Sequence, residues 1–253
     1  MTDIYKAPES DLTTGEESDS FGSLEKGLAG DYSIEIGAVF GEAWQRTKGH
    51  KGRILLAVLL YIVALVAVSF VAGAITGYSA FNPETAGDGP VSGLVGGALL
   101  YNLLVTVVTA PLTAGFMMIG VKVARGESAA PTEVFAHFDK LLPLAVVSIL
   151  MTILVTLGML LLVLPGIYLA VSYLLTLPLI VEKGLGPWQA LETSRKAVTK
   201  HWFAFLGYII VSILLYIAGA LPLLLGLIWV LPMLAIAYGV VYRNVFGGPE
   251  QQA

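Results

Sequence analysis

Four long stretches of the chain contain no charged residue and consist mainly of apolar side chains. They cover residues 54–83, 89–121, 141–181 and 202–242, and all of the charge lies in the segments around them. A bilayer core about 30 Å thick needs about 20 helical residues, so each of the first two stretches has the length of one span. The last two stretches are each 41 residues long, about twice the length of one span, so each is predicted to fold back as a hairpin.

The break within each long stretch is predicted where proline and glycine interrupt the apolar run. Pro165 and Gly166 follow Leu164 in the third stretch, and Pro222 lies between Gly219 and Gly226 in the fourth. Proline removes a backbone donor and glycine tolerates an irregular turn, so both favour a reversal of the chain. The predicted fold is therefore all-α, a bundle of six transmembrane helices at about 54–77, 94–121, 144–164, 167–181, 203–221 and 225–242.

The positions of lysine and arginine orient this bundle. Cytoplasmic loops carry an excess of these residues. With six alternating spans, the loop at 78–93 and the turns at Pro165 and Pro222 lie on one side and contain no lysine or arginine. The other side holds all 14 basic residues: Lys6, Lys26, Arg46, Lys48, Lys51, Arg53, Lys122, Arg125, Lys140, Lys183, Arg195, Lys196, Lys200 and Arg243. Both termini are therefore predicted to be cytoplasmic.

The N-terminal segment differs in character from the rest of the chain. Residues 1–45 contain ten acidic residues but only two basic ones, whereas the remaining 208 residues carry a net charge of +4. Residues 1–30 lack apolar periodicity and are predicted to be a disordered, acidic cytoplasmic tail. The chain does not start like a cleaved signal peptide. The predicted organisation is this tail, a membrane domain over 31–247, and a short cytoplasmic tail over 248–253.

Three amphipathic segments precede the odd-numbered spans. The first is predicted to start after Ser33 as its N-cap, the second covers residues 131–142, and the third begins at Pro187. Apolar residues recur on one face of each, as in a helix at a membrane surface. The sequence around Pro111 also matches that around Pro232 at an offset of 121 residues. The chain is therefore consistent with three repeats of a surface helix and a hairpin, and an unrepeated six-helix bundle is the alternative.

Three short motifs resemble a known family. They are Val-Leu-Pro-Gly-Ile-Tyr at 163–168, Leu-Pro-Leu-Ile-Val-Glu at 177–182, and Ala190-Leu191-x-x-Ser194-Arg195. Together they are similar to the YciC-like group of bacterial inner-membrane proteins. They also resemble the membrane domain that precedes some bacterial glycerophosphodiester phosphodiesterases, although we expect no catalytic domain to follow here. The resemblance extends over roughly residues 34–247, and it implies a helical membrane fold, a bacterial inner-membrane location and little about chemistry.

The sequence offers few groups for chemistry inside the membrane. The predicted spans contain no Asp, Glu, Lys, Arg or His, which argues against ion-coupled transport and intramembrane acid–base catalysis. Cysteine is absent, so disulfides and thiol chemistry are excluded. The three histidines match no local zinc spacing, and no phosphate-binding loop or basic nucleic-acid surface is recognisable. We therefore predict neither an enzyme nor a bound cofactor or metal, and no nucleic-acid partner.

Two sets of residues remain as candidate sites. Basic residues beside the spans attract anionic headgroups, although the positive-inside bias alone would also place them there. The candidate lipid contacts are Lys122, Arg125, Lys183, Arg195, Lys196, Lys200 and Arg243. A polar seam at helical spacing, which either bonds the helices together or lines a solute path, is formed by Asn102, Thr106, Thr109, Thr113, Ser148, Thr152 and Thr156.

These observations lead to two hypotheses about function. The first is a non-enzymatic protein that acts through lipid or protein contacts in envelope homeostasis, with membrane lipids as the predicted partners and a protein partner left open. The second is a transporter or channel for a neutral or amphipathic solute, with the polar seam as its path.

Overall fold

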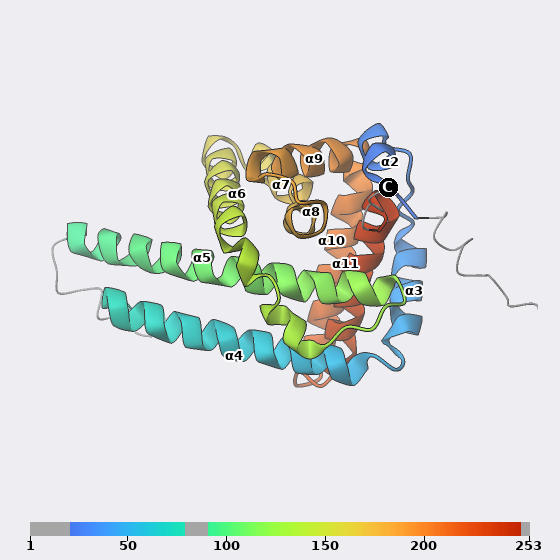
Figure 1. Ribbon diagram of the computed structural model, residues 1–253, viewed down its shortest axis with the longest axis horizontal. Coiled ribbons are helices and arrows are strands. Elements are labelled where there is room, and N and C mark those ends of the chain that lie inside the picture. The colour runs from blue at the N-terminus through green and yellow to red at the C-terminus, as the bar shows by residue number, and fades with distance from the viewer. Residues whose placement is uncertain (1–20, 79–90, 249–253) are drawn as a thin grey trace, which may run out of the picture.

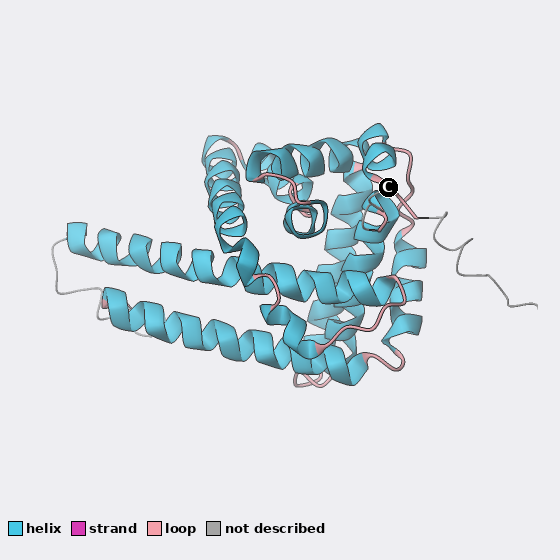
Figure 2. Ribbon diagram, in the orientation of Figure 1, coloured by secondary structure: helices cyan, strands magenta, loops and turns pink. Residues whose placement is uncertain are grey.

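The computed structural model describes residues 21–78 and 91–248 of the chain. Within these ranges the backbone forms helices joined by loops, with no strand (Figure 2). Six helical segments of this part are long and apolar enough to cross a membrane. The chain is therefore a multi-pass helical membrane protein, which confirms the fold class predicted from the hydropathy pattern.

The six spans form three hairpins. These are α4 (Lys51–Thr76) with α5 (Val91–Ala124), α6 (Leu141–Leu161) with α7 (Val163–Ser172) and α8 (Thr176–Lys183), and α10 (Trp202–Ala220) with α11 (Leu227–Phe246). Figure 1 shows α4 and α5 running side by side across the direction of α6, α10 and α11. The hairpins therefore spread apart instead of forming one parallel bundle.

Each hairpin has an exposed first helix and a buried second one. In the most apolar window of each first helix, only 11%, 22% and 17% of the residues are buried, for α4, α6 and α10 in that order. The corresponding shares are 50% for α5, 56% for the span formed by α7 and α8, and 67% for α11. The centre of the molecule is thus built from the second helices, and this threefold pattern agrees with a repeat of hairpins.

The two longest of these inner helices, α5 and α11, meet at small residues. A Cβ atom on Gly120 would overlap the carbonyl oxygen of Ala235, and one on Gly239 would overlap the carbonyl oxygen of Gly120. Both helices contain an internal proline, Pro111 or Pro232, which are the residues aligned by the 121-residue offset. Small side chains let helix backbones approach closely, so glycine sets the spacing between these two helices.

Surface helices surround this centre, and the first of them starts later than predicted. Helix α3 covers Ile36–Thr47 and packs along α11, with Val39 and Ala43 buried. Its N-cap residue is Glu35, which makes no side-chain cap. The prediction of Ser33 as the N-cap is therefore wrong, because the chain stays extended through Glu35.

Part of the predicted disordered tail is folded. Residues 1–20 lie outside the described part of the chain, but Leu24–Ala29 forms helix α2. Ser23 caps its N-terminus through the Lys26 N–H at 3.1 Å, and Gly30 ends it at φ 85°. The prediction that residues 1–30 are disordered is therefore wrong for its last third, since α2 is stabilised by packing against α9 (Pro187–Lys200) and α11.

The second amphipathic segment is not a continuous α-helix. It forms two 3₁₀ turns, η2 (Pro131–Phe135) and η3 (Phe138–Lys140), which lead directly into α6. Val134 is fully buried against the first hairpin, where the η2 backbone approaches Gly115 of α5. The predicted surface helix over 131–142 is therefore replaced by tight turns that fit closely beneath α5.

The reversal of the second hairpin lies before Pro165 rather than at it. Leu162 is extended, and α7 begins at Val163, so Pro165 and Gly166 belong to the first turn of α7. A proline ring clashes with the carbonyl of the residue four positions earlier, here Leu161, where α6 ends. The proline thus ends α6 as expected, but the predicted position of the break at 164–166 is wrong because proline is tolerated in the first turn of a helix.

The fourth span is also interrupted in its middle. Helix α7 ends at Ser172 and α8 starts at Thr176, where the sequence predicts one span over 167–181. The hydroxyl of Ser194 in α9 donates to the Ser172 carbonyl at 2.7 Å and accepts from the Leu175 N–H at 3.3 Å. The phenol of Tyr238 in α11 donates to the Leu174 carbonyl at 2.9 Å. Side chains from two neighbouring helices therefore replace the missing helical bonds.

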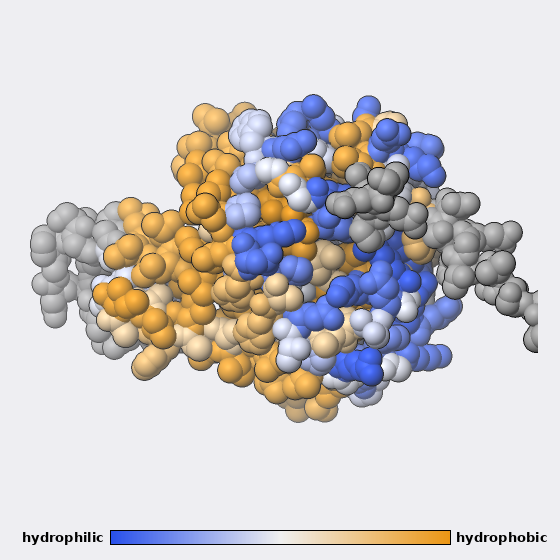
Figure 3. Space-filling view, in the orientation of Figure 1, coloured by the Kyte–Doolittle hydropathy of each residue, from blue (hydrophilic) through white to orange (hydrophobic). Residues whose placement is uncertain are grey.

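Polar and apolar surfaces are clearly separated. Figure 3 shows hydrophilic residues over the middle and right of the view and apolar ones over α4, α6 and the turn between α10 and α11.

One contact joins the first and third hairpins: the Lys51 ammonium at the start of α4 lies 3.8 Å from the ring centre of Trp229, near the start of α11. The predicted topology places Lys51 on the cytoplasmic side and the turn between α10 and α11 on the opposite side, so this contact does not agree with a one-sided arrangement of all the basic residues.

Candidate functional site

Helix α9 lies on the polar face and connects the second hairpin to the third. Pro187 occupies its first turn, where the missing N–H costs nothing. Leu191, Ser194 and Val198 are buried against the helices below, whereas Trp188 of the predicted apolar face is 63% exposed. The predicted amphipathic helix is therefore present, and its buried stripe is narrower than its apolar residues suggest.

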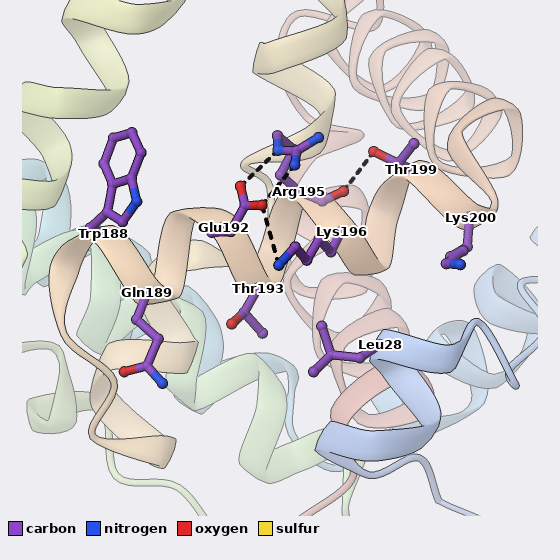
Figure 4. A pocket seen from close by; sticks show the side chains of 9 residues that line it. All are labelled: Leu28, Trp188, Gln189, Glu192, Thr193, Arg195, Lys196, Thr199 and Lys200. Atoms are coloured by element: carbon purple, nitrogen blue, oxygen red, sulfur yellow. Dashed lines mark hydrogen bonds and ion pairs between the residues drawn. The ribbon is translucent and has the colours of Figure 1, made fainter.

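A hollow of about 760 Å³ lies on the outer side of α9. Figure 4 shows that α9 supplies nearly all of its wall and that Leu28 reaches in from α2. Three cations and one carboxylate line it, which gives this hollow, the α9 groove, a formal charge of +2. The lining residues are Leu28, Trp188, Gln189, Glu192, Thr193, Arg195, Lys196, Thr199 and Lys200.

The single carboxylate of the α9 groove is held by two of the cations. Glu192 accepts two hydrogen bonds from Arg195, at 2.7 and 2.8 Å, and its carboxylate lies 3.4 Å from the Lys196 ammonium. The hydrogen bonds from Arg195 lower the pKa of Glu192 to about 2, and the same pairing raises the pKa of Arg195. Glu192 is therefore ionised at neutral pH, and the surplus positive charge lies at Lys196 and Lys200.

Two other predicted lipid contacts are enclosed in the protein instead. Arg125, at the end of α5, pairs with Glu182 of α8 at 2.7 Å, and both side chains are less than 8% exposed. The same guanidinium donates to the carbonyl of Gly247, just beyond α11. Arg125 thus ties together the C-terminal ends of α5, α8 and α11.

Arg243 is buried in the same way near the end of α11. Its guanidinium donates to both carboxylate oxygens of Glu42 in α3, at 2.6 and 2.8 Å, and also to the carbonyl of Ala124. Burial raises the pKa of Glu42, but the hydrogen bonds and charges of Arg243 and Arg46 outweigh it, so the net pKa is lowered. These contacts leave Arg243 facing one protein carboxylate and a backbone carbonyl rather than solvent.

The two remaining predicted lipid contacts, Lys122 and Lys183, are neither in the α9 groove nor as deeply buried as Arg125 and Arg243. Lys122 pairs with Glu133 at 2.7 Å and is about one-third exposed, and Lys183 donates to the Gly248 carbonyl at 2.6 Å. The structure therefore divides the seven predicted residues into groups. Arg195, Lys196 and Lys200 meet in the α9 groove, whereas the others lie in the network where the inner helices end.

The predicted polar seam is not gathered along one path. Asn102, Thr152 and Thr156 are exposed on the outside of their helices, and the first two donate to carbonyls of their own helix. Thr109 likewise donates to the Val105 carbonyl, and Thr106 and Ser148 are half-buried. Thr113 differs because it also bonds the phenol of Tyr61 in α4 at 3.0 Å.

Sequence reasoning missed the groups that hold the interrupted span. Ser194 and Tyr238 are named by no charge or spacing rule, although Ser194 is part of the motif that carries the family resemblance. Glu182 was likewise overlooked as the partner of Arg125, since 57 residues separate them. Only the three-dimensional structure brings these pairs together.

No family model, curated protein or solved structure matches this chain. The fold and site define a multi-pass helical membrane protein with three hairpins, an interrupted fourth span and a basic groove on a surface helix.

Proposed function

We propose that this protein is a non-enzymatic component of a bacterial inner membrane that binds anionic lipid headgroups in the α9 groove. The supporting observation is the surplus positive charge of Lys196 and Lys200, which share the α9 groove with the exposed indole of Trp188. Cations next to a span attract anionic headgroups, and tryptophan favours the headgroup region. Such a contact suits a role in envelope homeostasis.

Membership of the YciC-like group and a cytoplasmic location of both termini belong to the same proposal. The motif around Ser194 supports the first, because its serine has a definite task at the interrupted span. The one-sided distribution of lysine and arginine supports the second. The α9 groove then faces the cytoplasm, where anionic lipids meet the basic surface.

The test is lipid binding by the purified protein. Phosphatidylglycerol titrated into detergent-solubilised protein and followed by native mass spectrometry should bind the Lys196→Gln/Lys200→Gln variant about 30-fold more weakly, at roughly 1 kcal/mol per charge. The matched control, Lys48→Gln/Arg53→Gln, removes the same charge from exposed positions outside the groove. Equal binding by the wild type and the groove variant, or equal losses in both variants, would reject the groove as the site.

A transporter for a neutral solute is the second candidate, and the interrupted fourth span favours it. Interrupted transmembrane helices form the substrate sites of several transporter folds. Light scattering by proteoliposomes challenged with uncharged polyols tests this candidate. Protein-dependent flux that Ser194→Ala alters would support it, and flux equal to that of empty liposomes would exclude these solutes.

A further inference from the structure

A separate cavity lies between the first and third hairpins, on the apolar part of the molecule. It has a volume of about 390 Å³, within the range of small-molecule sites, and its walls come from α4, α5, α10 and α11. Most of its surface is apolar, and its hydroxyl groups belong to Tyr61, Thr113, Tyr208 and Tyr238. The occupant must therefore be largely apolar, and these hydroxyls decide which polar group it carries.

Three of the four hydroxyl groups that line this cavity already donate their protons within the protein. Thr113 donates its single proton to the Thr109 carbonyl at 3.0 Å. Its oxygen lies 3.0 Å from the Tyr61 phenol, so Tyr61 is the donor in that pair. Tyr238 in turn gives its proton to the Leu174 carbonyl of the interrupted span. The phenols of Tyr61 and Tyr238 already donate their only protons within the protein. They can therefore accept a hydrogen bond from a ligand but cannot donate one.

From this hydrogen-bond arrangement we propose that the cavity between α4, α5, α10 and α11 binds a membrane-soluble alcohol, with its hydroxyl donating to the Tyr61 or Tyr238 oxygen. The stacked rings of Tyr61 and Phe116, with centres 5.5 Å apart, form an apolar wall for the body of the ligand. A ketone or an ether of the same shape has no proton to donate to Tyr61 or Tyr238, so it forms one hydrogen bond fewer than the alcohol and binds more weakly. This site is distinct from the α9 groove, which recognises charge at the membrane surface.

A matched pair of ligands tests the proposal on the wild-type protein. The protein in detergent is photolabelled with a 16-carbon alcohol that carries a diazirine, and unlabelled 1-hexadecanol or its methyl ether competes. One hydrogen bond is worth about 1 kcal/mol, so the alcohol should compete about fivefold better than the ether for peptides that contain Tyr61 or Tyr238. Equal competition by the two compounds would overturn the proposal.

Two variants check which groups are responsible. Tyr61→Phe keeps the ring but removes the acceptor, so the preference for the alcohol should fall. Thr113→Val removes the acceptor for the Tyr61 proton, which is then free to donate, so competition by the ether should improve. A purely structural role for Thr113 would not produce this reversal.

Tyr216→Phe, on the exposed side of α10, serves as the control and should leave the preference unchanged. An unchanged preference in both Tyr61→Phe and Thr113→Val would reject the assignment. Because the groove variants Lys196→Gln/Lys200→Gln leave this cavity untouched, failure of either proposal can be recognised independently of the other.

Discussion

The hydroxyl of Ser194 lies 2.7 Å from the carbonyl oxygen of Ser172, and it fills the gap between α7 and α8. Both residues are fully buried. A backbone interruption inside a membrane requires partners for the freed polar groups, since no water is present to supply them. One serine on a surface helix therefore makes the shape of the fourth span possible.

Removal of this hydroxyl should destabilise the fold. Ser194→Ala leaves the Ser172 carbonyl and the Leu175 N–H without their side-chain partner, at a cost of about 2–4 kcal/mol. Denaturant unfolding in detergent measures the effect. Ser212→Ala is the matched control, because the Ser212 hydroxyl donates to a carbonyl of its own helix, and it should cost less than about 1 kcal/mol. Equal losses in the two variants would contradict this role for Ser194.

The buried pair of Arg125 and Glu182 should behave as one unit. Arg125→Met leaves the Glu182 carboxylate buried without its partner, and the expected loss is about 3–5 kcal/mol. Arg125→Met/Glu182→Met should recover most of that loss, because no charge then remains to be desolvated. Arg195→Met, which breaks a half-exposed pair with Glu192, should cost at most about 1 kcal/mol. A double variant as unstable as the two single variants combined would show that the pair is not coupled.

Neutralisation of Glu192 should strengthen lipid binding. Glu192→Gln raises the formal charge of the α9 groove from +2 to +3, and phosphatidylglycerol affinity should increase about fivefold, at roughly 1 kcal/mol per charge. Native mass spectrometry measures the change. Weaker binding by this variant would indicate that Glu192 itself contacts the lipid or positions Arg195.

The pH dependence of this carboxylate follows from its low pKa. The ordinary pKa is 4.5 and pairing with Arg195 lowers it to about 2, so Glu192 contributes to stability above about pH 4.5. That contribution fades only as the pH falls from about 4.5 to about 2. The ¹³C chemical shift of the Glu192 carboxylate should therefore stay constant between pH 7 and pH 4. A midpoint near 4.5 would show that Arg195 does not hold it.

Close packing of α5 against α11 makes a contrasting prediction for two glycines. Gly120→Ala forces a methyl group into the Ala235 backbone and should lower the thermal unfolding temperature. Gly41→Ala, in α3, meets no atom within 4 Å and should stabilise the protein by up to about 1 kcal/mol, because alanine favours the helix. If both variants lower the unfolding temperature alike, the close approach of α5 and α11 is not the cause.

The orientation of the protein in the membrane can be tested by cysteine labelling without background from native residues, because the chain contains no cysteine. Single cysteines at Ser128, after α5, and at Leu223, in the turn between α10 and α11, are treated with a membrane-impermeant maleimide on spheroplasts. Leu223→Cys should react directly, and Ser128→Cys should react only after permeabilisation. The opposite pattern would reverse the proposed topology.

The sequence predicts the spans well because the apolar runs are long and charge-free. All six appear, and the turn around Pro222 lies between Ala220 and Leu227 as expected. The errors occur where tertiary contacts outweigh local signals. Helix α2 has few apolar residues of its own, and its stability comes from packing on α9 and α11.

Prediction of the candidate sites from sequence is likewise limited by contacts between residues that are far apart in the chain. Net charge and spacing identify Lys196 and Lys200 as accessible cations, but they cannot show that Arg125 and Arg243 turn inward. The deciding partners, Glu182 and Glu42, are 57 and 201 residues away in sequence. The polar side chains of α5 and α6 also match helical spacing, yet four of the seven donate to a carbonyl of their own helix.

The division into exposed and buried helices has a consequence for how the chain is made. In every hairpin the exposed helix comes first in sequence, as α4, α6 and α10, and the buried one follows. The exposed helix therefore leaves the ribosome before its partner and can enter the lipid bilayer alone. The buried second helix then enters beside a helix that is already inserted. This applies to α5 and α11, which contain glycines and an internal proline, and to the interrupted span of α7 and α8. The order of synthesis thus provides each inner helix with a neighbour from the moment it enters the membrane.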